Sequence, residues 1–271
     1  MNWGAGFHAP AGARVAASAY ELYVGRWSRL FVPTVLAAAQ IGKGDRVLDV
    51  ATGSGEAAQM AVRLVGDSGL VIGADISCAM LAAAHARLSG EPFCAAAMDG
   101  QALAFRDASF DGVLCQLGLM FFPDPLRGLA EFRRVLRPGR CAAVCVISTA
   151  DRAPMWGFLA EALSRHLPDH ATTLQLSFAL ADPARLEGMF HSAGFRDIAV
   201  NEETREAIVD SFDEYWAPIE AGTGQLPQAY LALPDPSRRA VRDEVRARLA
   251  KFESDGRYRM SVAMIIGAGR A

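Results

Sequence analysis

Short apolar runs alternate with helix-forming segments along the middle of the chain. The apolar runs predict buried strands near 46–51, 70–74, 93–98, 110–115 and 140–148, and the segments between them predict helices near 55–65, 78–88 and 125–137. Strands that alternate with helices through short links pair in parallel, with right-handed crossovers. The pattern therefore predicts an α/β, doubly wound sheet, which binds its ligands at the carboxyl ends of the strands.

The last 120 or so residues carry a second, less regular pattern. Helices are predicted at 156–167 and 185–194, and two strands, near 195–209 and 258–268, fit an antiparallel pair that closes the sheet. The residues between these strands, 212–257, are predicted to be an insert with one helix at 237–251. We expect an N-terminal helical lid segment over 1–40, a core over 41–150, and a C-terminal half over 151–271 with the helical cap insert.

The composition of the chain indicates which classes of binding partner to expect. It has 271 residues, 52% hydrophobic and 21% charged, with a formal net charge of −3, so we expect a large core and no general attraction to nucleic acid or to an anionic membrane. No apolar segment is long enough to span a bilayer, and we expect a cytoplasmic protein, monomer or homodimer. The five cysteines form no C-x-x-C pair and no zinc spacing, and no metal site is expected.

The stretch V-L-D-V-A-T-G-S-G, residues 47–55, predicts a buried strand followed by a tight turn and a helix N-terminus. Gly53 and Gly55 have no Cβ, so the turn can reach positive φ and a ligand can approach the backbone. Asp75 lies twenty residues after Gly55, at the end of the next predicted strand, where a carboxylate can accept both hydroxyls of a ribose. Together these features predict a site for a nucleoside cofactor.

Asp49, which opens D-V-A-T-G-S-G, makes this motif resemble that of the class I S-adenosylmethionine (SAM)-dependent methyltransferases, D-x-G-x-G-x-G. Ala51 replaces the first glycine, which leaves slightly less room beside the cofactor. With the 136–139 sequence L-R-P-G, residues 20–150 are similar to the small-molecule branch of the ubiquinone/menaquinone-biosynthesis (methyltransferase type 11) group. The resemblance implies a Rossmann-like, mostly parallel seven-stranded sheet with an antiparallel last strand, SAM as cofactor and S-adenosylhomocysteine as product.

The resemblance also implies roles for individual residues. Asp99 would accept a hydrogen bond from the adenine amino group, and the Gly100 N–H would meet a ring nitrogen. Arg26 or Ser28 would meet the methionine carboxylate of SAM. The full set expected around the cofactor is Tyr20, Arg26, Ser28, Asp49, Ala51, Thr52, Gly53, Ser54, Gly55, Asp75, Ile76, Met80, Met98, Asp99, Gly100, Gln116 and Leu117.

The acceptor is expected to be a small, partly apolar metabolite, methylated on oxygen or carbon. We expect its pocket to be roofed by residues 20–29 and by the insert, with Tyr23, Trp27, Trp156, Tyr215 and Trp216 as candidate walls. The alternative is that these aromatic residues only anchor the two segments to the domain. No catalytic base is identified, although His8, His166 and His170 lie in segments that could reach the site.

Other functions stay open at this stage. The turn Gly53-x-Gly55-x-x-Ala58 also fits the dinucleotide fingerprint G-x-G-x-x-A, so a nicotinamide-dependent oxidoreductase is one alternative. A non-enzymatic SAM-binding protein is another, because no catalytic residue stands out. Arsenic methylation needs several thiolates, and only Cys115 could reach the site. The sequence also lacks the Asn/Asp-Pro-Pro-aromatic motif that amino-methylating DNA enzymes need.

Overall fold

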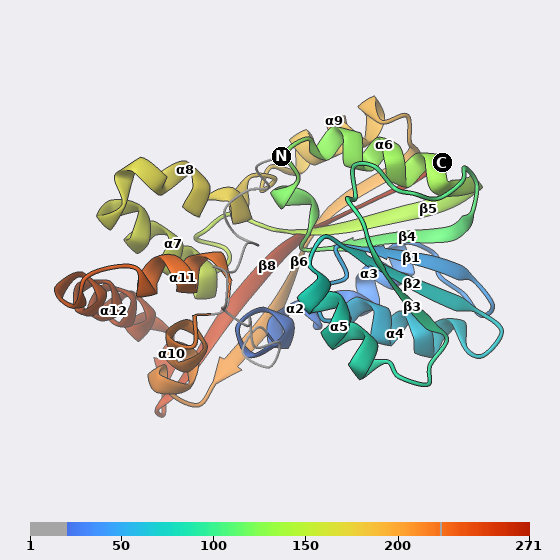
Figure 1. Cartoon of the computed structure of the whole chain (residues 1–271). Coiled ribbons are helices and arrows are strands. Elements are labelled where there is room, and N and C mark those ends of the chain that lie inside the picture. Colours follow the sequence, from blue (N-terminus) through green and yellow to red (C-terminus); the bar gives the residue numbers. More distant parts are fainter. Residues whose placement is uncertain (1–20, 223) are drawn as a thin grey trace.

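The computed structural model describes residues 21–222 and 224–271, and its strands form one eight-stranded sheet in the order β3-β2-β1-β4-β5-β8-β6, with β7 paired to β8 (Figure 1). The strands are β1 (Arg46–Val50), β2 (Leu70–Asp75), β3 (Phe93–Ala97), β4 (Phe110–Gln116), β5 (Leu136–Ile147), β6 (Arg196–Val209), β7 (Glu253–Ser254) and β8 (Arg257–Arg270). Neighbours from β3 through β5 pair in parallel, which confirms the predicted doubly wound α/β fold.

Helices cover both faces of the parallel part of this sheet, and others form the cap beside it. The longer ones are α3 (Val32–Ala38), α4 (Glu56–Val65), α5 (Cys78–Arg87), α6 (Pro125–Val135), α7 (Pro154–His166), α9 (Pro183–Ser192), α10 (Phe212–Glu220), α11 (Gln225–Leu231) and α12 (Asp235–Leu249). Figure 1 shows α6 and α9 above the sheet, and α3, α4 and α5 below it. β1 and β4 are buried along most of their length, as expected for strands in the middle of such a sheet.

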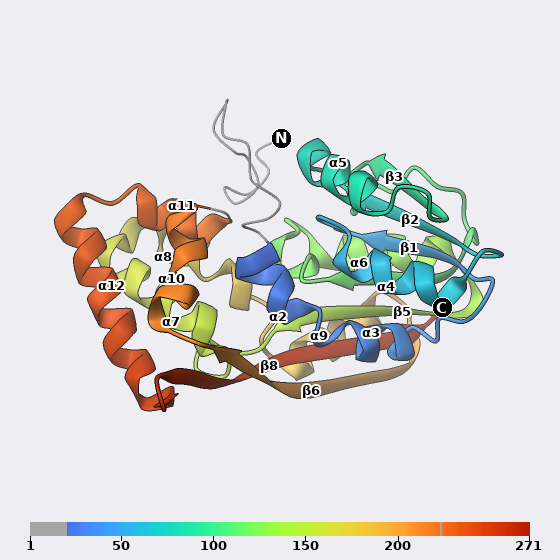
Figure 2. The same cartoon turned by 90° about the horizontal axis from the view of Figure 1, so that it is seen from below.

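The last strand, β8, runs antiparallel to both β5 and β6, as predicted. The sheet has eight strands rather than the predicted seven, because β7 is a two-residue strand, too short to leave a hydrophobic pattern. β6 and β8 are each 14 residues long and run on past the parallel strands toward the helices of the cap (Figure 2). They therefore connect the sheet to the cap.

The insert between β6 and β8 holds three helices, α10, α11 and α12, where the sequence predicted one. The two missed helices have seven and nine residues, and Pro218 lies inside α10, so neither shows a long helical period. Trp216 is fully buried, stacks on Phe212 at 5.4 Å between ring centroids and meets Tyr230 edge-on at 5.2 Å. The insert therefore has an aromatic core of its own.

Shorter helical turns complete the structure. They are η1 (Glu21–Gly25), α2 (Arg26–Ser28), η2 (Leu119–Phe121), η3 (Pro168–His170), α8 (Ala171–Leu174), η4 (Leu176–Phe178) and η5 (Ala250–Phe252). The helix predicted over 125–137 ends at Val135, because Leu136 already pairs with Phe110 and begins β5. The domain boundaries proposed at residues 40 and 150 stay predictions. Strands from both sides of residue 150 belong to one sheet. Among the described helices, none combines the length and apolar content needed to cross a membrane.

Candidate functional site

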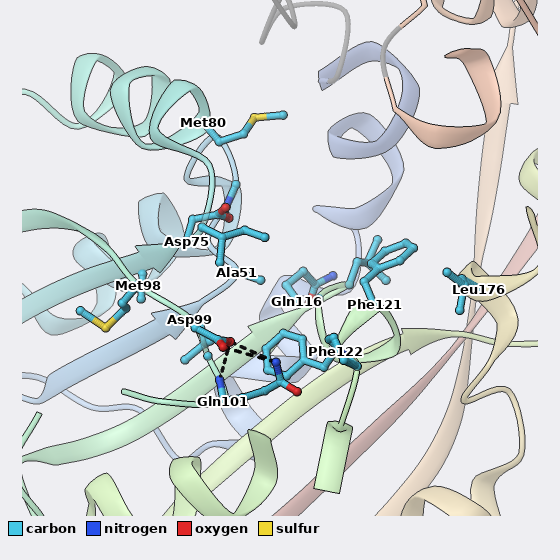
Figure 3. Close-up of a pocket in the computed structure, with 18 of the residues that line it drawn as sticks. Ala51, Asp75, Met80, Met98, Asp99, Gln101, Gln116, Phe121, Phe122 and Leu176 are labelled. Atoms are coloured by element: carbon cyan, nitrogen blue, oxygen red, sulfur yellow. Dashed lines mark hydrogen bonds between the residues drawn. The ribbon is translucent and has the colours of Figure 1, made fainter. Parts of the chain in front are cut away.

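A cavity of about 940 Å³ lies at the carboxyl ends of β1, β2, β3 and β4 (Figure 3). Most of the cofactor candidates line it, together with residues that the sequence did not indicate. The lining residues are Val50, Ala51, Gly53, Ala74, Asp75, Ile76, Met80, Met98, Asp99, Gly100, Gln101, Gln116, Leu117, Gly118, Phe121, Phe122, Pro123, Leu176 and Gln225. The strand ends thus bring together residues that are far apart in the sequence.

Asp75, the last residue of β2, fixes the glycine turn. Its Oδ2 accepts the Gly53 N–H at 2.9 Å, and its Oδ1 accepts the Ser77 N–H at 2.8 Å. Burial raises the pKa of this carboxyl, and the two backbone N–H groups oppose the shift. A carboxylate oxygen can accept a second hydrogen bond, so both oxygens can still bind a ligand hydroxyl.

Asp49 lies behind the cavity rather than in its lining. It is fully buried, its Oδ2 accepts the Thr52 hydroxyl at 2.7 Å, and its Oδ1 has no partner among the described residues. Burial raises the pKa of Asp49 to about 7. Thr52 and Ser54 are also buried, and Gly55 (φ +86°) begins the next helix, so these four residues shape the turn without facing the cavity.

Asp99 and Gln101 form a small network on the other side of the cavity. Asp99 Oδ1 accepts hydrogen bonds from the Gln101 N–H at 2.9 Å and from Gln101 Nε2 at 3.2 Å (Figure 3). Gln101 Oε1 in turn accepts the Asp124 N–H at 2.7 Å. A Cβ on Gly100 would lie 2.4 Å from the Phe122 ring, so only glycine fits between the acid and this ring.

Gln116 and Leu117 line the cavity at the carboxyl end of β4. Gln116 Nε2 donates to the Ser28 carbonyl at 3.1 Å, and Gln116 Oε1 is buried without a partner among the described residues. Leu117 has φ +53° and Ala51 has φ +57°, both unusual for residues with a side chain. The two turns touch, because a Cβ on Gly118 would lie 2.4 Å from the Ala51 Cβ.

The structure does not bring the N-terminal candidates to the cavity. Tyr20 lies outside the described residues. Arg26 forms an ion pair with Glu214 and donates from Nη2 to the Ile208 carbonyl at 2.9 Å, so its charge is already neutralised by the cap. Ser28 is buried and lines no part of the cavity. Arg26 and Ser28 are therefore not among the residues we propose for the methionine carboxylate.

A second chamber, of about 570 Å³, adjoins the first and shares Leu117, Phe121 and Gln225 with it. Its other walls are Tyr23, Val24, Met120, Ile147, Trp156, Ser177, Gly224 and Leu226. These residues come from η1, η2, the end of β5, α7, η4 and the start of α11. The chamber is therefore closed by segments from both ends of the sequence.

Only two of the five aromatic residues proposed as acceptor walls, Tyr23 and Trp156, line this chamber. Trp27 and Tyr215 line a smaller cleft of about 260 Å³ beside Arg26, and Trp216 lies in the aromatic core of the cap. The places of these three residues agree with the alternative, that they only anchor the N-terminal segment and the insert to the domain. The Tyr215 hydroxyl, for example, donates to the Met155 carbonyl at 2.7 Å and ties α10 to α7.

Several residues that line the first cavity belong to no known sequence motif and were not predicted from the sequence. Phe121 and Phe122 belong to the M-F-F-P run after β4, which could have indicated an apolar wall. Leu176 and Gln225 reach the cavity only through the folding of the C-terminal half. Of the histidine candidates, His166 and His170 are exposed and line neither chamber, and His8 lies outside the described residues.

Comparison with known proteins agrees with this geometry. Residues 48–143 match the family described as "Methyltransferase domain". The chain is 32% identical over 198 residues to the ubiquinone/menaquinone biosynthesis C-methyltransferase UbiE of Xanthomonas campestris pv. campestris, covering 62% of this chain and 71% of that relative. It is 39% identical over 131 residues to the demethylmenaquinone methyltransferase of Mycobacterium marinum, covering 48% and 54%.

A solved structure shares the fold across nearly the whole chain. The phosphoethanolamine N-methyltransferase 2 of Haemonchus contortus, in complex with S-adenosyl-L-methionine, matches with a TM-score of 0.61 and 18% identity. The match covers 95% of this chain and 57% of that one. At this identity the likeness concerns the fold alone.

Proposed function

Because this chain belongs to the class I SAM-dependent methyltransferases, we propose that it transfers a methyl group from SAM to a small, partly apolar acceptor held in the second chamber. The observation that carries this proposal is the pair of adjoining cavities. One cavity contains two carboxylates at strand ends, and the other has an apolar lining. Leu117, Phe121 and Gln225 form their common boundary, where the methyl group would pass.

The charge of the first cavity fits SAM. Among the described residues, its lining includes Asp75 and Asp99 and no lysine, arginine or histidine. SAM carries a sulfonium, an ammonium and a carboxylate, and its net positive charge is favoured by two carboxylates, whereas the pyrophosphate of a nicotinamide cofactor needs cations or free backbone N–H groups. The Gly53 N–H is already bonded to Asp75, so the glycine turn offers that donor to no phosphate. These contacts argue against the nicotinamide alternative.

We assign the cofactor contacts as follows. Asp75 accepts the two ribose hydroxyls, and Asp99 accepts the adenine amino group beside the Gly100 N–H. Ile76 is 43% exposed and lines the cavity, so an adenine ring packed on it covers apolar surface. Gln116 Oε1, held in place by the bond from Nε2 to Ser28, accepts from the methionine ammonium.

When bound, SAM supplies an electrophilic methyl group on its sulfonium. The chain's own contribution is to hold the acceptor in line with that group and to exclude water from the boundary between the chambers. The relatives named above are C-methyltransferases of quinone biosynthesis and a demethylmenaquinone methyltransferase. We therefore propose a quinol-like carbon as the first acceptor to test, with a hydroxyl oxygen as the alternative.

The test is product formation. Incubation of the protein with SAM and 1,4-naphthohydroquinone should yield S-adenosylhomocysteine and a ring-methylated product, both measurable by mass spectrometry. A panel of phenols, assayed in parallel as alternative acceptors, distinguishes methylation on a ring carbon from methylation on a hydroxyl oxygen. The proposal fails if calorimetry detects binding of neither SAM nor S-adenosylhomocysteine, or if NAD binds more tightly than SAM.

A further inference from the structure

We propose that the second chamber selects an uncharged, ring-bearing acceptor, and that Ser177 and Gln225 bind the acceptor's hydroxyl group as its polar anchor. This inference rests on the proposed function, because it names what the chamber beside the SAM cavity recognises. It goes further by assigning two residues that no sequence motif indicates. Both belong to the C-terminal half, Ser177 in η4 and Gln225 at the first position of α11.

The chamber contains no charged side chain among the described residues that line it. Its walls are mostly aliphatic and aromatic, with Met120, Ile147, Trp156 and Leu226 among them. A charged acceptor would lose its water here without gaining a counterion, which is strongly unfavourable. The same walls favour a flat apolar ring.

The two aromatic walls add no charge. Trp156 Nε1 donates to the Tyr23 carbonyl at 3.2 Å, so the polar edge of the indole is already bonded within the protein. Burial raises the pKa of Tyr23 well above its ordinary value, with a further contribution from neighbouring Tyr215, so its phenol stays neutral. An acceptor therefore meets uncharged rings on this side.

The polar anchor stands at the boundary with the SAM cavity. Gln225 lines both chambers; its Nε2 donates to the Thr173 carbonyl at 2.5 Å, which fixes the amide and leaves Oε1 buried without a partner among the described residues. Ser177, which lines the second chamber beside it, is 8% exposed. Unsatisfied buried polar groups cost free energy, which a ligand can recover by bonding to them.

A hydroxyl group satisfies both residues at once, because it can donate to Gln225 Oε1 and accept from the Ser177 hydroxyl. A carboxylate cannot donate to Oε1, and an ammonium cannot accept from Ser177. The anchor would hold a hydroxylated ring next to Leu117 and Phe121, where the two chambers meet. This places the ring where the methyl group is delivered.

Four probes that share one ring system test the selection: 1-naphthol, naphthalene, 1-naphthoate and 1-naphthylmethylammonium. Their binding to the full-length protein saturated with S-adenosylhomocysteine is measured by ligand-observed NMR at pH 7, where 1-naphthol is neutral. We expect 1-naphthol to bind at least about tenfold more tightly than each of the other three. If either charged probe binds as tightly as 1-naphthol, the inference is wrong.

Variants test the anchor. Gln225→Leu and Ser177→Ala should bring the 1-naphthol and naphthalene affinities within about threefold of each other, whereas Gln228→Leu, on the same helix but outside both chambers, should leave the preference unchanged. Gln225→Glu should shift the preference toward 1-naphthylmethylammonium, a change that a merely structural residue would not produce.

Titration with S-adenosylhomocysteine separates the two proposals. If the product binds all variants as it binds the original protein, the fold is intact, and an unchanged 1-naphthol preference in Gln225→Leu overturns the anchor alone. If the product does not bind even the unaltered protein, the proposed function fails and this inference fails with it.

Discussion

Each oxygen of the Asp75 carboxylate accepts one backbone N–H, from Gly53 or from Ser77, and keeps a lone pair for a ligand. The same side chain therefore shapes the glycine turn and binds the ribose in our assignment. Two hydrogen bonds to a charged acceptor contribute on the order of 1.5–3 kcal/mol each.

We predict that Asp75→Ala lowers the affinity for SAM and S-adenosylhomocysteine by at least about tenfold, since roughly 1.4 kcal/mol corresponds to that factor. Isothermal titration calorimetry measures the change. Asp67→Ala is the matched control, because Asp67 is an exposed acid in the turn before β2 and lines neither of the two chambers. Equal affinity of Asp75→Ala and the unaltered protein would remove the ribose assignment.

Asp49 predicts a pH dependence of stability. Its pKa is raised by burial to about 7 in the folded protein, whereas an unfolded aspartate has a pKa of about 3.9. Between these values the folded state binds a proton that the unfolded state does not, so the Asp49 contribution to the free energy of unfolding falls as pH rises from about 4 to about 7. Above pH 7 both states are ionised and the contribution levels off.

As pH rises, we expect the free energy of unfolding of the original protein to fall relative to that of Asp49→Asn. The variant cannot ionise, so it should gain stability relative to the original protein by a few kcal/mol between about pH 4 and pH 7. Urea unfolding at a series of pH values measures this difference. A difference that stays constant across the range would show that Asp49 does not titrate as argued.

At the scale of elements, the turns after β1 and β4 depend on each other. The methyl group of Ala51 occupies the space that a side chain at residue 118 would need, since the two Cβ atoms would be 2.4 Å apart. Ala51 itself has positive φ, a conformation that glycine adopts without strain. The replacement of the motif's first glycine by alanine is therefore matched by a glycine on the neighbouring turn.

Gly118→Ala should destabilise the protein by about 1–3 kcal/mol through overpacking. Ala51→Gly in the same chain should recover part of this loss, and not all of it, because the new methyl group would also lie 2.9 Å from Cys115 Sγ. A double-mutant cycle from thermal or urea unfolding gives the coupling. Strict additivity of the two substitutions would contradict the contact.

At the scale of the molecule, the second chamber is closed by residues 21–29 on one side and by α11 on the other. Gln116 bonds to Ser28, and Gln225 bonds to Thr173, so both closing segments are linked to the residues around the cavities. Phe212 stacks on Trp216 within α10, and neither residue lines either chamber. We infer that the closing segments respond to ligands while α10 does not.

Amide hydrogen exchange should show that ligands affect the two closing segments and not α10. S-adenosylhomocysteine should slow amide exchange within 21–29, and 1-naphthol added afterwards should slow it within 224–231. Exchange within α10, measured in the same experiment, serves as the reference and should not change. Identical exchange in both closing segments with and without ligands would mean that they do not close over the site.

We also predict that turnover does not depend on a metal ion. Within residues 21–222 and 224–271, no three histidine, cysteine, aspartate or glutamate side chains come together as metal ligands. Activity measured by S-adenosylhomocysteine formation should survive EDTA. Activity that disappears in EDTA and returns with magnesium would refute this.

The sequence by itself determined the sheet and the cofactor side of the site. Its apolar runs located the strands to within a few residues, because strands buried on both faces are mostly apolar. Gly53, Asp75 and Asp99, which line the first cavity, could be found because strand order brings successive strand ends to one edge. Local pattern and topology were sufficient there.

Only the tertiary structure decided the acceptor side. Gln225 reaches the chamber because β6 and β8 carry the insert around to it, and Ser177 reaches it from η4, between α8 and α9; no period in the sequence records either path. Arg26 could not be excluded from the cofactor site until Glu214, 188 positions away, was seen to neutralise it. Aromatic residues such as Trp216 look alike in the sequence whether they pack a core or line a pocket, because both places favour the same side chains. Long-range packing distinguishes them.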